Sequence, residues 1–378
     1  MNKSLSLITL LARTYHADSV LEDIYAKIEG DVDWDEVEWL IQHHRVSGLC
    51  LQTLRKIRHK AIPTSLLQNL QIRCSEATRN SLVLMNALHQ LIVLIQSAGI
   101  EVACFKGVVA AQMIYGQLSI RNFSDIDLLV RKSDHQHTER LLIKNGFRIT
   151  HRYDNAFQSG LRDDKRRVNV DLHWGIPPRE LNLASQLLWD EISTIEVGNQ
   201  SIPTFSLNDT IIITAINAVK EFWDASLYRF CDLAELIQRN PQLDWNRLFR
   251  RASQMGCKRM LYVALIVADK CLAAPLPRDV SSTLDDLDEL NPIVNELIAQ
   301  LENNHLISAD EHFRQTQTLT SHRHFFMLMQ DTQWQRLKYW LNWVTTPGTA
   351  DHQFIKLPRA LSLLYYVIRP FRLLLHRD

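Results

Sequence analysis

The sequence predicts an α+β protein in which a small α/β core with a mixed sheet is flanked by helical regions at both ends. Three observations predict this class. Glycine and proline contribute only 11 residues each to a chain of 378, which disfavours turn-dense all-β folds. Apolar residues recur at helical spacing in both terminal thirds of the chain. Between residues 99 and 206, β-prone runs alternate with helical stretches, as expected for a compact α/β unit.

The N-terminal region, residues 1–98, is predicted to be helical, with a break at Pro63 before a further helix. Within that helix the segment Asn80–Ile100 carries no charge over 21 residues, which is long enough to span a membrane. However, polar residues recur through it, and Leu84 and Leu88 follow helical spacing. We therefore expect a buried amphipathic helix rather than a membrane span.

The core, residues 99–206, is predicted to contain four strands and two helices. We expect a hairpin turn near Gly160, and Ser133 as the N-cap of the second helix. The predicted elements, in order, are a strand at Ile100–Phe105, a helix at Gly107–Tyr115, a strand at Asp125–Val130, a helix from Ser133 to Asn145, and strands at Phe147–Tyr153 and Val168–His173.

The C-terminal region, residues 207–378, is again predicted to be helical. The expected helices are Leu207–Phe222, Leu227–Gln238, Trp245–Met255, Cys257–Cys271 and Val294–Glu302. The final segment, 354–378, has a net charge of +4 and interleaved apolar residues. Such an end fits either contact with a membrane surface or polyanion, or packing against the helical region.

Composition and charge restrict the classes of function. The 42 basic and 42 acidic residues give a formal net charge of zero, so no overall field attracts nucleic acid or anionic lipid. None of the six cysteines forms a C-x-x-C pair, which indicates reduced thiols in a cytoplasmic protein. The N-terminus is a poor signal peptide, because its short apolar run contains polar residues and ends at Arg13.

Acidic side chains in two predicted strands form the clearest chemical pattern. Side chains alternate between faces of a strand, so Asp125 and Asp127 point the same way, about 6–7 Å apart. In the later strand, Asn169, Asp171 and His173 share one face. If the two strands are neighbours, Asp171 completes a three-carboxylate cluster, which would repel itself unless it held divalent metal such as Mg²⁺.

A glycine between a predicted strand and helix adds an anion site. Gly107 lets backbone N–H groups approach a phosphate at the helix N-terminus, and Lys106 and Arg121 supply positive charge beside it. Carboxylates for two metal ions together with such a site suggest a nucleoside triphosphate. We expect that replacing either cation weakens nucleotide binding more than it alters the fold, because solvated charges contribute little to stability.

These residues resemble the nucleotidyltransferase superfamily typified by DNA polymerase β. The pattern K-G-x(7)-Y-G-x(4)-R-x(3)-D-I-D-L-L-V, followed by V-D-L-H-W, is similar to a bacterial family of uncharacterised nucleotidyltransferases. The later F-W-x(4)-Y-R-F-C-D-L-A-E-L-I and the end near Arg369 extend the resemblance over about residues 30–375.

The resemblance implies a nucleotidyltransferase core and a role for each residue of the motifs. Asp125 and Asp127 would bind two Mg²⁺ ions. Asp171 would bind the catalytic ion and act as base or orient the base, and Gly107 would hold the triphosphate, for which we expect ATP. The superfamily usually has glycine or serine directly after this glycine, whereas Val108 stands here. A hydroxyl contact to the phosphate is therefore missing, and Lys106 is a candidate substitute.

Other interpretations of these residues stay open. The acidic run at Asp125 is also compatible with a solvated turn. His173 is either a group that contacts substrate or a strand-edge histidine. A further set on two predicted helices could close over the nucleotide, or could hold an ion pair between its arginine and aspartate; its members are Lys220, Trp223, Arg229 and Asp232.

The function predicted from the sequence is Mg²⁺-dependent transfer of a nucleoside monophosphate from a triphosphate to an acceptor hydroxyl, with release of pyrophosphate. The acceptor could be a small molecule, a peptide or RNA. One alternative is a degenerate nucleotidyltransferase fold that binds nucleotide or a partner without turnover. Another is a toxin-like enzyme that modifies tRNA.

Overall fold

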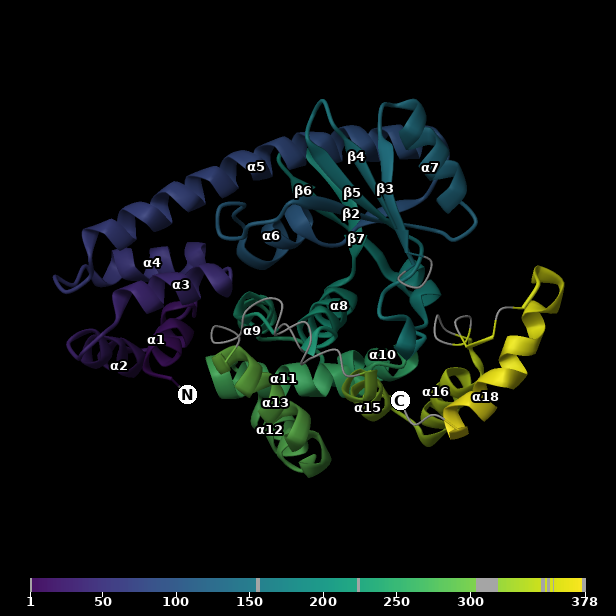
Figure 1. Ribbon diagram of the computed structural model, residues 1–378. Helices are drawn as coiled ribbons and strands as arrows, with labels where there is room; N and C mark the ends of the chain where they lie inside the picture. Colours follow the sequence, from purple (N-terminus) through teal and green to yellow (C-terminus); the bar gives the residue numbers. More distant parts are fainter. Residues whose placement is uncertain are drawn as a thin grey trace. The chain divides into compact units, whose positions relative to one another are not determined.

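The computed structural model describes residues 2–153, 157–222, 225–303, 319–347, 351, 354–355 and 357–375. The chain divides into two compact units, Met1–Thr316 and Gln317–Asp378. The first unit combines helices with a mixed five-stranded sheet, which confirms the predicted α+β class (Figure 1). The predicted boundaries at residues 98 and 206 stay predictions.

The N-terminal helices pack into one layer that leads to the sheet. They are α1 (Lys3–Leu11), α2 (Asp18–Ile28), α3 (Trp34–His43), α4 (Ser47–Ile57) and α5 (Thr64–Ser97). Helix α5 begins directly after Pro63, as predicted, and runs from the other N-terminal helices to β1 and β2 (Figure 1). None of the helices in the described part of the chain combines the length and apolar character that a membrane crossing requires.

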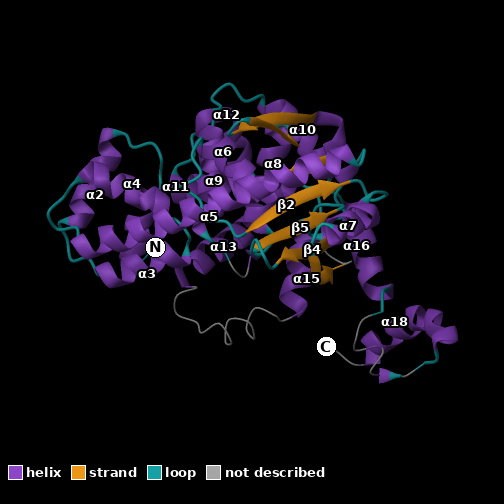
Figure 2. Cartoon of the chain, turned by 90° about the horizontal axis from the view of Figure 1, so that it is seen from above, coloured by secondary structure: helices purple, strands orange, loops and turns teal. Residues whose placement is uncertain are grey.

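The sheet has the strand order β1-β2-β5-β4-β3. Its only parallel pair among the described strands is β2 with β5, and Figure 2 shows β2, β5 and β4 side by side. The core elements are β1 (Val102–Cys104), α6 (Gly107–Tyr115), β2 (Asp125–Val130), α7 (His135–Lys144), β3 (Arg148–Tyr153), β4 (Gln158–Asp163) and β5 (Val168–His173). Buried residues from α5 and the strands form one hydrophobic cluster, which fixes the sheet against that helix.

Two predictions about the core are wrong. Gly160 lies inside strand β4 rather than in a hairpin turn, where it pairs with His151 of β3. A Cβ atom at Gly160 would lie 2.0 Å from the His151 ring, so this strand requires glycine to admit the ring. Ser133 is not the N-cap of α7. The helix begins at His135, and Asp134 is its N-cap residue.

The sequence also gives no sign of a second sheet. The hairpin β6 (Ile192–Val197) with β7 (Gln200–Phe205) follows the short 3-10 helices η2 (Arg179–Leu181) and η3 (Ser185–Glu191). Strand β6 is exposed at most positions, so its side chains lack the apolar alternation on which strand prediction depends.

Helices complete the first unit. They are α8 (Leu207–Val219), α9 (Leu227–Arg239), α10 (Trp245–Met255), α11 (Lys258–Leu272), α12 (Arg278–Asp285), η5 (Asp288–Leu290) and α13 (Asn291–Asn303). The predicted helices in this region are confirmed to within a few residues at each end. Helices α8, α9 and α11 pack on one another, and α9 also contacts α6 of the core.

The second unit contains α15 (Leu319–Leu328), α16 (Gln333–Thr345), η6 (Arg359–Leu364) and α18 (Tyr365–Leu375). Two arginines of the basic segment, Arg369 and Arg372, both bind the buried carboxylate of Asp351, the latter at 2.7 Å. This pairing neutralises part of the positive charge that the sequence offers to a membrane or polyanion. Contact of 354–378 with either partner stays a prediction.

Candidate functional site

Parallel pairing of β2 and β5 brings the acidic side chains together. Asp127 lies in register with Asp171, and Asp125 with Asn169, so the prediction that these strands are neighbours is confirmed. The alternate residues Ile126 and Leu128 are buried in the hydrophobic cluster. Burial of the apolar face therefore directs the carboxylates to the opposite face.

Asp127, Asp171 and His173 form the tightest group of candidate metal ligands in the described residues. One ligand atom from each lies within 4.8 Å of the other two. Of the three carboxylates predicted to bind metal, Asp125 lies outside this group but lines the same cavity. His173 Nε2 lies 3.1 Å from Asp127 Oδ1, which makes the histidine part of the site rather than a strand-edge residue.

Lys106 forms an ion pair with the most buried of these acids. Its Nζ lies 2.8 Å from Asp127 Oδ1, and the two side chains are 27% and 6% exposed. The premise that Lys106 is a solvated charge is therefore wrong, and its removal is expected to affect the fold as well as nucleotide binding. Arg121 is not a solvated charge either, because its Nη2 lies 3.1 Å from Oδ2 of the buried Asp232.

The site separates the pKa values of its acids. Burial alone would raise the pKa of Asp127, but the Lys106 ammonium and the His173 ring hold that pKa below its usual range. Burial, with Asp127 and Asp125 nearby, raises the pKa of Asp171 to about 7. Burial lowers the pKa of His173 to about 4, so its imidazole is neutral at pH 7. The protein thus holds a charged carboxylate beside one that titrates near neutrality.

Gln158 is a site residue that the sequence does not reveal. Its Nε2 donates a 2.6 Å hydrogen bond to Asp171 Oδ2, and it stands opposite His173 in the register of β4 and β5. Alternation of side chains within β4 would indicate that Gln158 points toward the site, but this requires a strand at a position where the sequence predicts a turn at Gly160.

Gly107 begins helix α6 in a left-handed conformation, with φ +54°. A Cβ atom there would lie 3.1 Å from the carbonyl oxygen of Asp125, so both backbone conformation and space require glycine. Val108 is buried in the hydrophobic cluster and is not among the residues that line the cavity. The valine that departs from the superfamily pattern therefore serves packing.

A cavity of about 670 Å³ surrounds these groups. Three parts of the first unit line it: the end of α3 and the residues after it through Gln42 and Arg45, the core, and helices α8 and α9. Arg121 and Asp232 join two of these parts, and Tyr115 also donates a 2.9 Å hydrogen bond to Asp232 Oδ1. The cavity is therefore built by tertiary packing around the strand carboxylates.

The helices contribute further cations to the cavity. Lys220 and Arg229 line it, and burial together with Lys106 lowers the pKa of Lys220 to about 8.

Arg229 binds Glu221 at 2.6 Å, whereas Asp232 binds Arg121. The alternative interpretation, an ion pair between Arg229 and Asp232, is thus wrong, because each residue has another partner. Trp223, expected beside them, lies outside the described residues.

Three buried nitrogen atoms in and near the cavity lack a hydrogen-bond partner among the described residues. Two belong to lining residues, Arg121 (Nε) and Arg229 (Nη1), and the third is Nδ1 of His173, which contacts Asp127. A buried donor without a partner is costly, and an anionic ligand would supply acceptors for the two guanidinium groups.

The donor set fits a divalent cation. Asp127 and Asp171 offer carboxylate oxygens, the ligands that Mg²⁺ prefers, and Asp125 adds a third carboxylate in the same cavity. His173 adds a nitrogen donor, which suits transition metals such as Zn²⁺ or Fe²⁺ better than Mg²⁺. The Lys106 ammonium holds one oxygen of Asp127, so a cation at that oxygen would compete with the lysine.

Comparison with known proteins gives one family match. Residues 30–273 match a family described as uncharacterised nucleotidyltransferase, and no curated protein matches the chain. An antigenic nucleotidyltransferase-like protein from Paracoccidioides brasiliensis is a structural neighbour at 14% identity and a TM-score of 0.35, over 56% of this chain and 92% of that one. The antibiotic-resistance factor ANT(2'')-Ia gives 14% identity and a TM-score of 0.28, over 53% and 95% of the two chains. A tRNA-processing enzyme gives 11% identity and a TM-score of 0.25, over 77% and 90%.

Proposed function

The chain belongs to a family of uncharacterised nucleotidyltransferases, and from this premise we propose that it transfers a nucleoside monophosphate from a nucleoside triphosphate to an acceptor hydroxyl. The observation that carries the proposal is the register of β2 and β5, in which Asp127 and Asp171 stand opposite each other in a cavity lined by cations. ATP is the first triphosphate to test. A cytoplasmic location is part of the proposal and is supported by six free cysteines.

Asp171 is suited to act on the acceptor hydroxyl. Without a bound cation its pKa is about 7, so the carboxylate can accept a proton near neutral pH, and Gln158 fixes its second oxygen. In the proposed reaction the hydroxyl passes its proton to the Asp171 carboxylate as its oxygen bonds to the α-phosphorus. The bond from that phosphorus to the β-phosphate oxygen breaks, and pyrophosphate leaves.

The cations of the cavity are suited to bind the triphosphate. Gly107 begins a helix whose N-terminus faces the cavity, and the buried guanidinium groups of Arg121 and Arg229 retain donors for phosphate oxygens. Asp125, Asp127 and Asp171 would hold Mg²⁺. When bound, the cation would neutralise phosphate charge and activate the attacking oxygen.

Pyrophosphate release tests the proposal. Wild-type protein with Mg²⁺, each of the four ribonucleoside triphosphates and a panel of hydroxyl acceptors should release pyrophosphate. Asp171→Asn should lose about a hundredfold or more of the turnover while still binding triphosphate within about tenfold. Asp164→Asn is the matched control, because Asp164 is an exposed acid that pairs with Arg148 outside the cavity. Equal losses in both variants would argue against a role for Asp171.

One observation favours a second candidate, a domain that binds nucleotide without turnover. The Lys106 ammonium already compensates the charge of Asp127, so the site is electrostatically satisfied without a metal ion. Calorimetry separates the two candidates. Binding of triphosphate with equal affinity in EDTA and in Mg²⁺, together with no pyrophosphate release, would favour the binding domain over the enzyme.

A further inference from the structure

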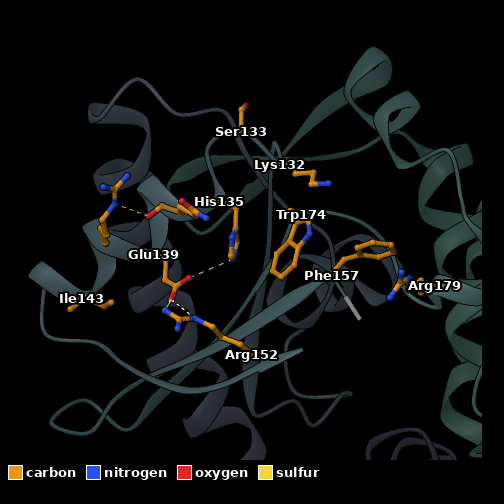
Figure 3. Close-up of a pocket in the computed structure, with 11 residues that line it drawn as sticks. Lys132, Ser133, His135, Glu139, Ile143, Arg152, Phe157, Trp174 and Arg179 are labelled. Atoms are coloured by element: carbon orange, nitrogen blue, oxygen red, sulfur yellow. Dashed lines mark hydrogen bonds and ion pairs between the residues drawn. The ribbon is translucent and has the colours of Figure 1, made fainter. Parts of the chain in front are cut away.

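A second cavity lies along helix α7 and has a volume of about 840 Å³. Its wall combines side chains from α7 and the residues before it with groups at the ends of β3, β4 and β5 (Figure 3). The lining residues are Lys132, Ser133, His135, Gln136, Glu139, Arg140, Ile143, Arg152, Phe157, Trp174 and Arg179. We call it the α7 cavity.

The α7 cavity is separate from the carboxylate site. No described residue lines both cavities. Neighbouring residues at two strand ends point in opposite directions: Gln158 bonds to Asp171, whereas Phe157 lines the α7 cavity. In the same way His173 contacts Asp127, whereas Trp174 lies against His135 of α7. The two cavities therefore lie on opposite faces of the sheet.

Positive charge is concentrated in the α7 cavity although the whole chain is neutral. Its described lining includes four cations, Lys132, Arg140, Arg152 and Arg179, against the single carboxylate of Glu139. That carboxylate accepts a 3.0 Å hydrogen bond from Arg152 Nε. Within the described part of the chain neither Lys132 nor Arg140 has an ion pair. The cavity thus has an excess of cations for which an anion is the matching ligand.

Aromatic side chains form another part of the same wall. The rings of Trp174 and His135 have centroids 3.9 Å apart, and Figure 3 shows the indole between His135 and Phe157. Phe157 has φ +55°, an uncommon conformation for a bulky residue. Its ring lies so close to Gly175 that a Cβ atom there would be 3.0 Å away. Such backbone strain persists where the surroundings enforce it and is frequent at ligand sites.

From these features we propose that the α7 cavity binds a nucleoside phosphate unit, with the phosphate at Lys132 and Arg140 and the base at Trp174. A cation cluster beside an aromatic platform matches a ligand that joins a phosphate to a planar ring. The volume lies within the range of small-molecule sites. The unit is either a free nucleotide or the end of a single-stranded RNA. This site is independent of the transfer reaction proposed above.

Direct binding tests the proposal with two probes, AMP and a six-nucleotide single-stranded RNA. Calorimetry in EDTA keeps divalent metal out of the carboxylate site. Wild-type protein should bind at least one probe saturably, and the double variant Lys132→Gln/Arg140→Gln should bind it at least tenfold more weakly. Both of these side chains are exposed, so the variant should fold. Trp174→Leu should weaken binding by a similar factor, because stacking contributes strongly to binding of bases.

Two control variants locate the binding. Arg148→Gln removes an exposed arginine of β3 outside the α7 cavity, and Lys220→Gln removes a cation of the carboxylate site. Arg148→Gln should bind within twofold of wild type, and Lys220→Gln reports any part of the binding that takes place at the carboxylate site. Binding of AMP indicates a free nucleotide, and binding of the RNA alone indicates a chain end. The proposal is overturned if neither probe saturates, if Arg148→Gln loses as much affinity as the double variant, or if only Lys220→Gln loses affinity.

Discussion

Lys106 and Asp127 show how a single contact links stability to the chemistry of the site. The lysine stabilises a carboxylate that is 6% exposed, and the same carboxylate is a candidate metal ligand. Leaving a buried charge without a partner is strongly destabilising, even where the pair itself contributes little net free energy. The lysine therefore matters most when no cation is bound.

Lys106→Gln should lower the free energy of unfolding in EDTA by about 3 kcal/mol, because the buried Asp127 carboxylate loses its cationic partner. Saturating Mg²⁺ should restore part of this loss, since a ligand that binds only the folded state stabilises it. Urea unfolding with EDTA and with Mg²⁺ measures both effects. The control is Lys132→Gln, an exposed lysine outside the carboxylate site. Identical urea midpoints for Lys106→Gln and wild type in EDTA would contradict the expectation.

Lys106 stabilises the metal-free protein, whereas the charged Asp171 carboxylate destabilises it. Its pKa is about 7 in the folded protein and about 3.9 in an unfolded chain, so the folded state binds more protons between these values. Stability contributed by this group therefore falls as pH rises from about 4 to 7, and the penalty is fully present above pH 7. The acid is retained at a cost in stability of the metal-free protein.

Asp171→Asn should accordingly melt at least about 2 °C above wild type at pH 8 in EDTA, because it removes at least ~1 kcal/mol of repulsion and desolvation. At pH 4 the two proteins should melt together, because the wild-type carboxyl is then protonated. Added Mg²⁺ should raise the melting temperature of wild type more than that of the variant. Thermal melts across this pH range measure the difference, and a variant less stable than wild type at pH 8 would refute the pKa argument.

At the scale of elements, the turn from β1 into α6 determines where a phosphate can lie. Lys106, directly before the helix, and Gly107, its first residue, both line the cavity. The left-handed φ of Gly107 and the nearby Asp125 carbonyl oxygen leave no room for a side chain. One backbone conformation thus positions both the lysine and the N–H groups of the helix.

Gly107→Ala should destabilise the protein by about 1–2 kcal/mol, the cost of a left-handed conformation for an L-residue. It should also weaken triphosphate binding at least tenfold, because the N–H groups shift. Gly99→Ala is the matched control: Gly99 also has a positive φ, at +73°, but no atom lies within 4 Å of its Cβ position. That variant should lose similar stability and keep its nucleotide affinity. If Gly99→Ala loses as much nucleotide affinity as Gly107→Ala, the loss of affinity results from lower stability and not from the position of Gly107.

At the scale of the whole molecule, the carboxylate cavity requires only the first unit. The N-terminal helices, the core and helices α8 and α9 all contribute lining residues, and all of these lie within Met1–Thr316. The second unit, Gln317–Asp378, has its own buried ion pairs between Asp351 and the arginines of α18.

A chain shortened to residues 1–316 should therefore fold and bind triphosphate within about twofold of the full chain. Its main melting transition should stay within about 2 °C, because the described residues of the site and its hydrophobic cluster are retained. Calorimetric melting and triphosphate titration of both chains measure these quantities. An unfolded fragment, or one with tenfold weaker binding, would mean that the second unit supports the site.

Local pattern predicts most of this fold and part of the site. Strand β2 and helix α6 have the predicted bounds, because alternation and helical spacing are properties of neighbouring residues. Strand β4 was missed since Gly160 looks like a turn residue, whereas it admits the His151 ring from the neighbouring strand. Strand β6 was missed because its exposed side chains have no apolar pattern.

The sequence by itself determined that Asp125, Asp127 and Asp171 lie on the polar faces of two strands, because burial of the alternate apolar residues leaves no other orientation. Only the tertiary structure decided which partner each charge has: Lys106 for Asp127, and Asp232 for Arg121. Ion pairs between distant segments depend on how strands and helices pack. The hydrophobic periodicity of one segment does not specify which distant segment packs against it.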